Sequence, residues 1–204
     1  MLKRMSWIRR YGRDKYYRLA KSMNKPSRAY FKLRELDSKH ALLKRGYKVI
    51  DLGSSPGGWV SYELERVGEE GLVFAIDKDE LRIKPHNNLV FIKADILNTD
   101  LERLISSIGV KVDLVASDLA PSFTGIRSVD MARHYELAHK ALELAQRTLG
   151  TGNFVVKLFM SDEFYEFQKE LIKTFEEVKI ERLPATREKS SELYAVCKRV
   201  RAHS

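Results

Sequence analysis

The sequence predicts an α/β fold with an open, mostly parallel sheet of seven strands, an antiparallel C-terminal strand and helices on both faces. Three observations predict it. From Tyr47 onward, short apolar runs alternate with segments of helical period. The last two apolar runs are joined by a loop that holds no helix, so they should pair antiparallel. A glycine-rich turn directly follows the first run, at the end of the sheet where α/β proteins bind ligands.

Two helices are expected ahead of the sheet, over 13–23 and 27–40; the second repeats Ala29, Leu33 and Leu36 at helical spacing. Helices should also fill the gaps between the first five strands. The predicted strands cover 47–52, 72–77, 89–94, 112–117, 153–159, 176–182 and 192–199. Five crossover strands and a terminal hairpin are typical of the Rossmann-like methyltransferases that use S-adenosylmethionine (SAM), whereas dinucleotide enzymes have six parallel strands.

Two of the later helices have clear patterns. The helix over 129–149 carries an unbroken apolar stripe and should end at Gly150. The helix over 162–174 should begin after Ser161 as its N-cap. Its apolar side chains are expected to face the sheet: Phe164, Phe167, Leu171 and Ile172.

Length and composition indicate one globular domain over 1–204, with a basic helical extension over 1–45 and a core over 46–204. The single cysteine, Cys197, excludes an intramolecular disulfide and a cysteine-rich metal site, so we expect no metal and a reducing cytoplasm. No apolar run is long enough for a membrane span and no signal peptide is visible, so a membrane partner is not expected.

The positive charge is concentrated at the N-terminus. The chain carries a net charge of +9, yet residues 1–34 hold twelve lysines and arginines against one acid, Asp14. Aromatic residues are interleaved with these cations: Trp7, Tyr11, Tyr16, Tyr17 and Tyr30. Cations and rings together suit a polyanion whose bases can stack, so RNA is the expected partner and the plain alternative is a solvated basic arm.

The loop from Lys48 to Trp59 follows the first strand and reads KVIDLGSSPGGW. Gly53, Gly57 and Gly58 let the backbone turn tightly and approach a ligand closely. The spacing differs from the dinucleotide pattern G-x-G-x-x-G, which would need glycine at Ser55, and is the variant associated with SAM.

Acidic residues stand at or just past the ends of four predicted strands: Asp51, Asp77, Asp95 and Asp118. Asp77 lies at the distance along the chain expected of a carboxylate that accepts hydrogen bonds from ribose hydroxyls. Asp95 could accept a hydrogen bond from the adenine amino group. Any one of them could be a helix cap or a turn residue, but four in register favour a nucleoside cofactor.

Over nearly its whole length the chain resembles the FtsJ-like RNA ribose 2′-O-methyltransferases. The matching segments are 14–17 (DKYY), 27–33 (SRAYFKL), 51–59 (DLGSSPGGW), 117–121 (SDLAP), 154–157 (FVVK) and 191–194 (SELY). The resemblance implies a catalytic tetrad of Lys32, Asp118, Lys157 and Glu192. It also implies SAM contacts from the loop and strand ends, namely Gly53, Gly57, Gly58, Trp59, Asp77, Asp95 and Asp118.

The resemblance further implies methylation of a uridine ribose in the A-loop of large-subunit rRNA. We also expect a monomer and no DNA partner. A tRNA anticodon loop is the alternative substrate. A silent RNA-binding assembly factor and a nicotinamide-dependent oxidoreductase are the alternatives from other classes. Lys157 lies inside an apolar strand, so we expect it to be essential, either as a base or as a group that orients the hydroxyl.

Overall fold

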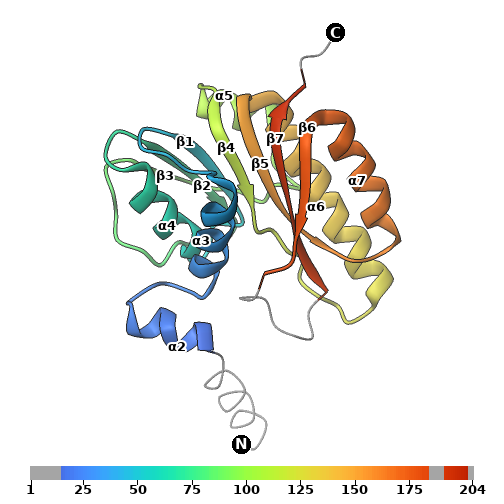
Figure 1. Ribbon diagram of the computed structural model, residues 1–204, viewed down its shortest axis with the longest axis horizontal. Helices are drawn as coiled ribbons and strands as arrows, with labels where there is room; N and C mark the ends of the chain where they lie inside the picture. The colour runs from blue at the N-terminus through green and yellow to red at the C-terminus, as the bar shows by residue number, and fades with distance from the viewer. Residues whose placement is uncertain (1–14, 184–190, 202–204) are drawn as a thin grey trace, which may run out of the picture.

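A seven-stranded sheet in the order β3-β2-β1-β4-β5-β7-β6 forms the centre of the protein (Figure 1). The computed structural model describes residues 15–183 and 191–201. The strands are β1 (Lys48–Leu52), β2 (Leu72–Asp77), β3 (Leu89–Lys93), β4 (Val112–Ser117), β5 (Leu149–Phe159), β6 (Phe175–Glu181) and β7 (Glu192–Val200). Neighbours from β3 to β5 pair in parallel, and β7 pairs antiparallel with both β5 and β6. The predicted sheet, including its antiparallel terminal strand, is confirmed.

Helices cover both faces of this sheet (Figure 1). They are α2 (Lys15–Ser22), α3 (Ala29–His40), α4 (Gly58–Val67), α5 (Leu101–Ile108), α6 (Arg127–Thr148) and α7 (Asp162–Thr174). Side chains of α3 and α4 share one hydrophobic cluster with Val49 and Val155, and side chains of α5, α6 and α7 share the other with Ile50 and Val156. Adjacent strand residues therefore point to opposite faces, and both faces are buried, which explains the continuous apolar runs.

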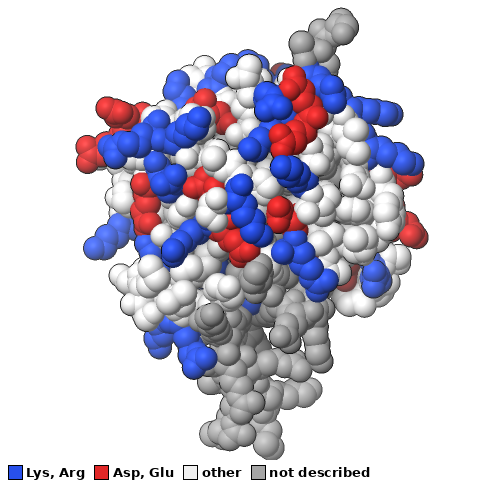
Figure 2. Space-filling model, viewed as in Figure 1, with Lys and Arg blue, Asp and Glu red and all other residues white. Residues whose placement is uncertain are grey.

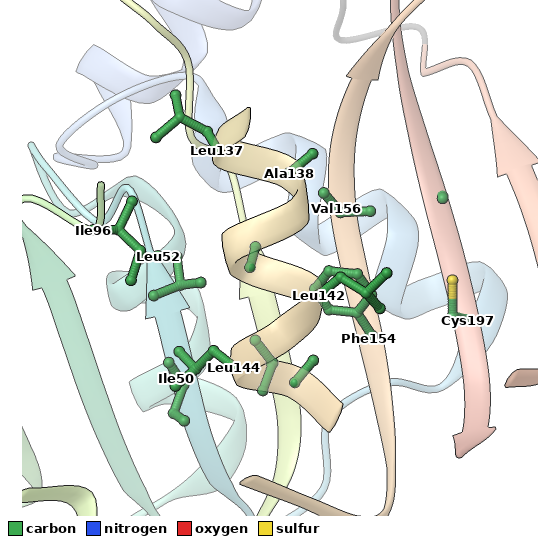
Figure 3. Packing of buried hydrophobic residues seen from close by; sticks show 14 of the residues in the cluster. Ile50, Leu52, Ile96, Leu137, Ala138, Leu142, Leu144, Phe154, Val156 and Cys197 are labelled. Carbon is green, nitrogen blue, oxygen red and sulfur yellow. The ribbon is translucent and has the colours of Figure 1, made fainter. Parts of the chain in front are cut away.

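Helix α6 packs along the second of these faces. Figure 3 shows its side chains, among them Leu142 and Leu144, against Ile50, Phe154 and Val156 of the sheet. Cys197 lies in the same cluster and is fully buried, and burial raises the pKa of its thiol. The apolar stripe that the sequence predicted for this helix is confirmed, because Met131, Tyr135, Ala138, Leu142 and Ala145 are all buried.

Three local expectations are wrong. No helix joins β2 to β3: residues 78–88 form a loop, which contains Pro85, a residue that disfavours helix in the positions before it. Helix α6 ends at Thr148, and β5 begins at once with Leu149 in extended conformation, so Gly150 is not its cap. Ile172 is 52% exposed, since it lies about 100° around α7 from Leu171, which faces the sheet.

A buried carboxylate joins α3 to α4. Asp37 is 4% exposed and accepts hydrogen bonds from the backbone N–H groups of Leu42 (2.8 Å) and Leu43 (2.9 Å). It also accepts from the Tyr62 hydroxyl (2.8 Å) and from Nε of Arg66 (3.0 Å). Four donors on one side chain satisfy the carboxylate fully, so the C-terminal end of α3 is held firmly against α4.

None of the helices in the described ranges combines the length and the apolar character that crossing a membrane requires.

Candidate active site

A cavity of about 430 Å³ opens at the carboxyl ends of the central strands. Four of the predicted cofactor residues line it: Gly53, Asp77, Asp95 and Asp118. The volume falls in the usual range for small-molecule sites, and the position is the one where open α/β sheets bind their ligands. The sequence therefore located this end of the sheet correctly.

The glycines of the β1–α4 loop serve two different contacts. Gly53 has φ = 80°, and a Cβ added there would lie 2.9 Å from the backbone nitrogen of Leu119, so only glycine lets this loop meet the loop after β4. Gly57 directly precedes α4, and a Cβ on Gly58 would lie 3.1 Å from Cβ of Ala29. Gly58 thus lets the start of α3 approach the start of α4.

Three predicted cofactor residues do not line the cavity: Gly57, Gly58 and Trp59. Trp59 is 2% exposed, and its ring centroid lies 5.8 Å from that of Tyr194 on β7. These three residues lie at the start of α4, away from the cavity lining. Their proposed contribution to cofactor binding is through the backbone path that they impose.

Two carboxylates order the walls of the cavity and keep acceptor capacity to spare. Asp77 accepts hydrogen bonds from the backbone N–H groups of Ser55 and Asp79, both at 2.8 Å. Asp95 accepts from the N–H of Leu97 at 3.1 Å and from the Asn98 amide at 3.0 Å. A carboxylate has about four acceptor positions, so each could also accept from a ligand hydroxyl or amino group.

The predicted tetrad is assembled beside this cavity as two ion pairs. Nζ of Lys32 lies 2.6 Å from Oε1 of Glu192, and Nζ of Lys157 lies 3.2 Å from Oδ1 of Asp118. Lys157 also donates a hydrogen bond to the backbone carbonyl of Asp118. Both lysines are only 6% exposed, and a buried ammonium requires such partners.

The topology explains how four distant segments meet. Lys157 lies two residues after Val155 on β5, so its side chain is on the same face of the sheet and faces α3, which carries Lys32 on its buried side. On the neighbouring strand, Tyr194 is in register with Lys157, and Glu192 lies two residues earlier on the same face. Asp118 follows the last residue of β4 at the same edge of the sheet.

Tyr194 connects the two ion pairs, a role that sequence reasoning missed. Nζ of Lys32 donates a hydrogen bond to the Tyr194 hydroxyl at 3.0 Å, and the hydroxyl donates to Oδ1 of Asp118 at 2.9 Å. Oε1 of Glu192 lies 3.2 Å from the same hydroxyl. Burial and the adjacent carboxylates raise the pKa of Tyr194, so the phenol stays protonated. The available signal was the period of two that places Tyr194 beside Glu192.

Asp118 belongs both to the cavity wall and to the tetrad. Burial opposes ionisation of this carboxyl, but the ammonium groups of Lys157 and Lys32 and the Tyr194 hydroxyl outweigh burial and hold its pKa below the usual value. Asp118 is therefore a carboxylate at neutral pH. It places fixed negative charge between a cofactor bound in the cavity and the two lysines.

A second residue that sequence reasoning missed is His134 of α6, which lies near Lys157 and Asp118. Its ring centroid is 4.7 Å from that of Phe159, and the side chain is 1% exposed. Burial, and then the charge of Lys157, lower the pKa of His134 to about 4. The imidazole is therefore neutral at physiological pH and adds no charge to the site.

Asp51, the fourth strand-end acid, does not reach the cavity. Its side chain points toward α4 between Ala75 and Ala116, its register partners on β2 and β4, which are small enough to leave room for it. There it meets Glu63, and both residues are fully buried. Among the described residues, no third side chain or backbone N–H group donates a hydrogen bond to either of them. Burial and mutual repulsion raise both pKa values, so the pair keeps a proton at neutral pH.

Replacing Glu63 by glutamine should make the fold more stable at neutral pH and less sensitive to pH. In the unfolded chain both carboxyls ionise above about pH 4, whereas the folded pair keeps one shared proton. The folded state therefore binds more protons, and the free energy of unfolding of the wild type should fall as the pH rises. Glu63→Gln removes one such proton and should gain at least about 1 kcal/mol at neutral pH in urea unfolding. Glu69→Gln, on an exposed residue, is the control. An unchanged pH dependence in Glu63→Gln would contradict the shared proton.

Comparison with known proteins identifies the family. A model of the FtsJ-like methyltransferases matches residues 26–200. The chain belongs to this family. It is therefore a SAM-dependent methyltransferase, as the motifs predicted, and the cavity with its carboxylates and its close glycine turn fits that cofactor.

Relatives of this FtsJ-like enzyme have consistent names. A protein of Methanothermobacter thermautotrophicus named ribosomal RNA large subunit methyltransferase E is 40% identical over 93% of this chain and 91% of its own. A protein of the same name from Bdellovibrio bacteriovorus is 42% identical over 90% and 95%. A crystal structure described as a ribosomal RNA methyltransferase of Plasmodium falciparum superposes with a TM-score of 0.75 at 28% identity, covering 86% of this chain and 98% of that one.

Proposed function

We propose that this enzyme methylates the 2′-hydroxyl of a ribose in RNA, and that its target is a uridine in the A-loop of large-subunit rRNA. The observation that carries the proposal is the pair of buried lysines, Lys32 and Lys157, held by Asp118 and Glu192 at the rim of the cofactor cavity. The names of the relatives support ribosomal RNA as the substrate.

The geometry supports a proposed role for each side chain. When bound, SAM supplies an electrophilic methyl group, and Asp77 and Asp95 would accept hydrogen bonds from its ribose and adenine. As the O–CH3 bond forms and the S–CH3 bond breaks, the hydroxyl proton passes to solvent water. Lys157 is ion-paired with Asp118 and so acts as a hydrogen-bond donor that holds the acceptor oxygen and stabilises the negative charge that this oxygen gains as its proton leaves. Lys32 and Tyr194 keep Asp118 oriented. Positioning of this kind can supply roughly 7 to 11 kcal/mol of the barrier reduction.

The basic N-terminal part is the proposed RNA-binding surface. In α2, Arg18 and Lys21 are exposed and no acid is present, and Figure 2 shows Lys and Arg without Asp or Glu among them over this helix. Lys25 forms an ion pair with Glu65 and is less available. The cations expected in residues 1–14 lie outside the described residues. We propose that segment 1–45 binds phosphates beside a core over 46–204.

The substrate is tested by transfer of tritiated methyl groups from SAM to large ribosomal subunits and, separately, to total tRNA. Wild-type enzyme should label the subunits, and Asp118→Ala should serve as the blank. Label in tRNA alone would favour the anticodon-loop alternative. No label in either RNA would support a silent assembly factor.

We expect the enzyme to act in the cytoplasm. We also expect a monomer, because an enzyme that docks on a much larger particle needs no second copy.

A further inference from the structure

Three exposed apolar side chains lie near the carboxyl end of the sheet, two between β4 and α6 and one just after β5. Phe123 is 58% exposed, Ile126 60% and Met160 41%. The Phe123 ring lies edge-on to that of Phe159, with centroids 5.8 Å apart. Phe159 is two residues beyond Lys157 on β5, so Phe123 lies at the same edge of the sheet as the catalytic cluster.

The loop that carries Phe123 is held in one position. The carboxylate of Asp130, 4% exposed, accepts hydrogen bonds from N–H and Oγ1 of Thr124, both at 2.7 Å, and from N–H of Gly125 at 3.1 Å. Arg127 donates to the Met160 carbonyl at 3.1 Å and ties the two segments together. A large exposed ring on so firmly anchored a loop suits ligand contact better than packing.

We propose that Phe123, Ile126 and Met160 form an apolar ledge on which a nucleobase next to the methylated ribose stacks. The inference rests on the proposed function, because a ribose whose hydroxyl reaches Lys157 brings its own base and its neighbours to this rim. Arg127 adjoins the ledge but also lies near the Glu163 carboxylate, so the cation offered to a flanking phosphate is Arg133, which lines the adjacent cavity. Rings flanked by arginines are the usual platform for single-stranded RNA.

A second copy of the chain is the competing occupant. Stable protein interfaces bury roughly 800 Å² on each partner, far more than three side chains can offer. The ledge therefore fits a flat, uncharged base better than a protein.

The test compares three substitutions of Phe123 that separate a π face from simple apolar contact. Phe123→Ala and Phe123→Leu should each raise the KM for RNA by about 5- to 100-fold, the range expected for loss of one stacked base. Phe123→Tyr keeps the ring and should stay near wild type. SAM affinity should not change in any of them. Ile172→Ala, an exposed apolar residue of α7, is the control.

Binding of RNA to each variant is also measured by fluorescence anisotropy, which does not depend on methyl transfer. If Phe123→Leu or Phe123→Ala binds RNA as wild type does, the ledge is not a stacking site. If wild type methylates no RNA but still binds it in a Phe123-dependent way, the proposed function fails and the ledge stands. If the wild type elutes as a dimer on gel filtration and Phe123→Ala elutes as a monomer with unchanged RNA affinity, the ledge is a self-association surface and the proposal is overturned.

Discussion

Lys157→Ala should lower kcat for RNA methylation by about 100- to 1,000-fold, the usual cost of removing a donor that stabilises developing negative charge. The affinity for SAM should change little, because Lys157 does not line the cavity and Asp77 and Asp95 remain. Single-turnover methylation with saturating RNA measures the chemical step directly.

Lys169→Ala is the matched control for this variant. Lys169 is an exposed lysine of α7 that forms an ion pair with Glu166 on the same helix, so its loss should leave the rate unchanged. Thermal melting of Lys157→Ala shows whether the fold survives, since Asp118 keeps the Tyr194 hydroxyl as a donor. A folded Lys157→Ala enzyme that methylates RNA at nearly the wild-type rate would exclude the proposed role.

Asp37→Ala should lower the free energy of unfolding by about 3–5 kcal/mol, as expected when one partner of a buried charged network is removed. The substitution leaves two backbone N–H groups and the Tyr62 hydroxyl without their acceptor. Arg66 is half exposed and contributes little to this loss, because water can solvate it. Urea unfolding followed by circular dichroism gives the value.

Asp100→Ala provides the comparison for Asp37. Asp100 also accepts backbone hydrogen bonds, from Glu102 and Arg103 at the start of α5, but it is exposed, so its loss should cost only about 1 kcal/mol. If Asp37→Ala lowers the free energy of unfolding by no more than Asp100→Ala does, the buried Asp37 network between α3 and α4 does not stabilise the fold as proposed. Because α3 carries Lys32, Asp37→Ala should also reduce activity in the folded fraction.

The strands were predictable because both faces of the sheet are buried, so the apolar runs of β1, β2 and β4 are continuous. The antiparallel β7 followed from the missing helix before it. Local patterns failed where the choice is made by packing. Ile172 is as apolar as Leu171, yet only one of the two faces the core. The gap between β2 and β3 was expected to hold a helix because the other gaps do, but Pro85 disfavours helix in the residues before it.

The site was predictable in its parts and not in its connections. The strand-end acids predicted the position of the cavity. Asp51 does not line it, because alternation along β1 places its side chain on the face with Val49, under α4. Lys32 could be linked to Glu192 only through the family resemblance, because 160 residues of chain separate them. Tyr194 was missed for a similar reason: its hydroxyl contacts Lys32 on α3 and Asp118 after β4, and no spacing in the sequence records these contacts.

The chemical position of the methyl group tests the central claim most directly. RNA methylated in vitro by the wild-type enzyme is digested to nucleosides and analysed by mass spectrometry with 2′-O-methyl and base-methyl standards. We expect a single new product, 2′-O-methyluridine, that is missing when Lys157→Ala is used. A methyl group on a base nitrogen or carbon would contradict the assignment of Lys32, Asp118, Lys157 and Glu192 to ribose methylation.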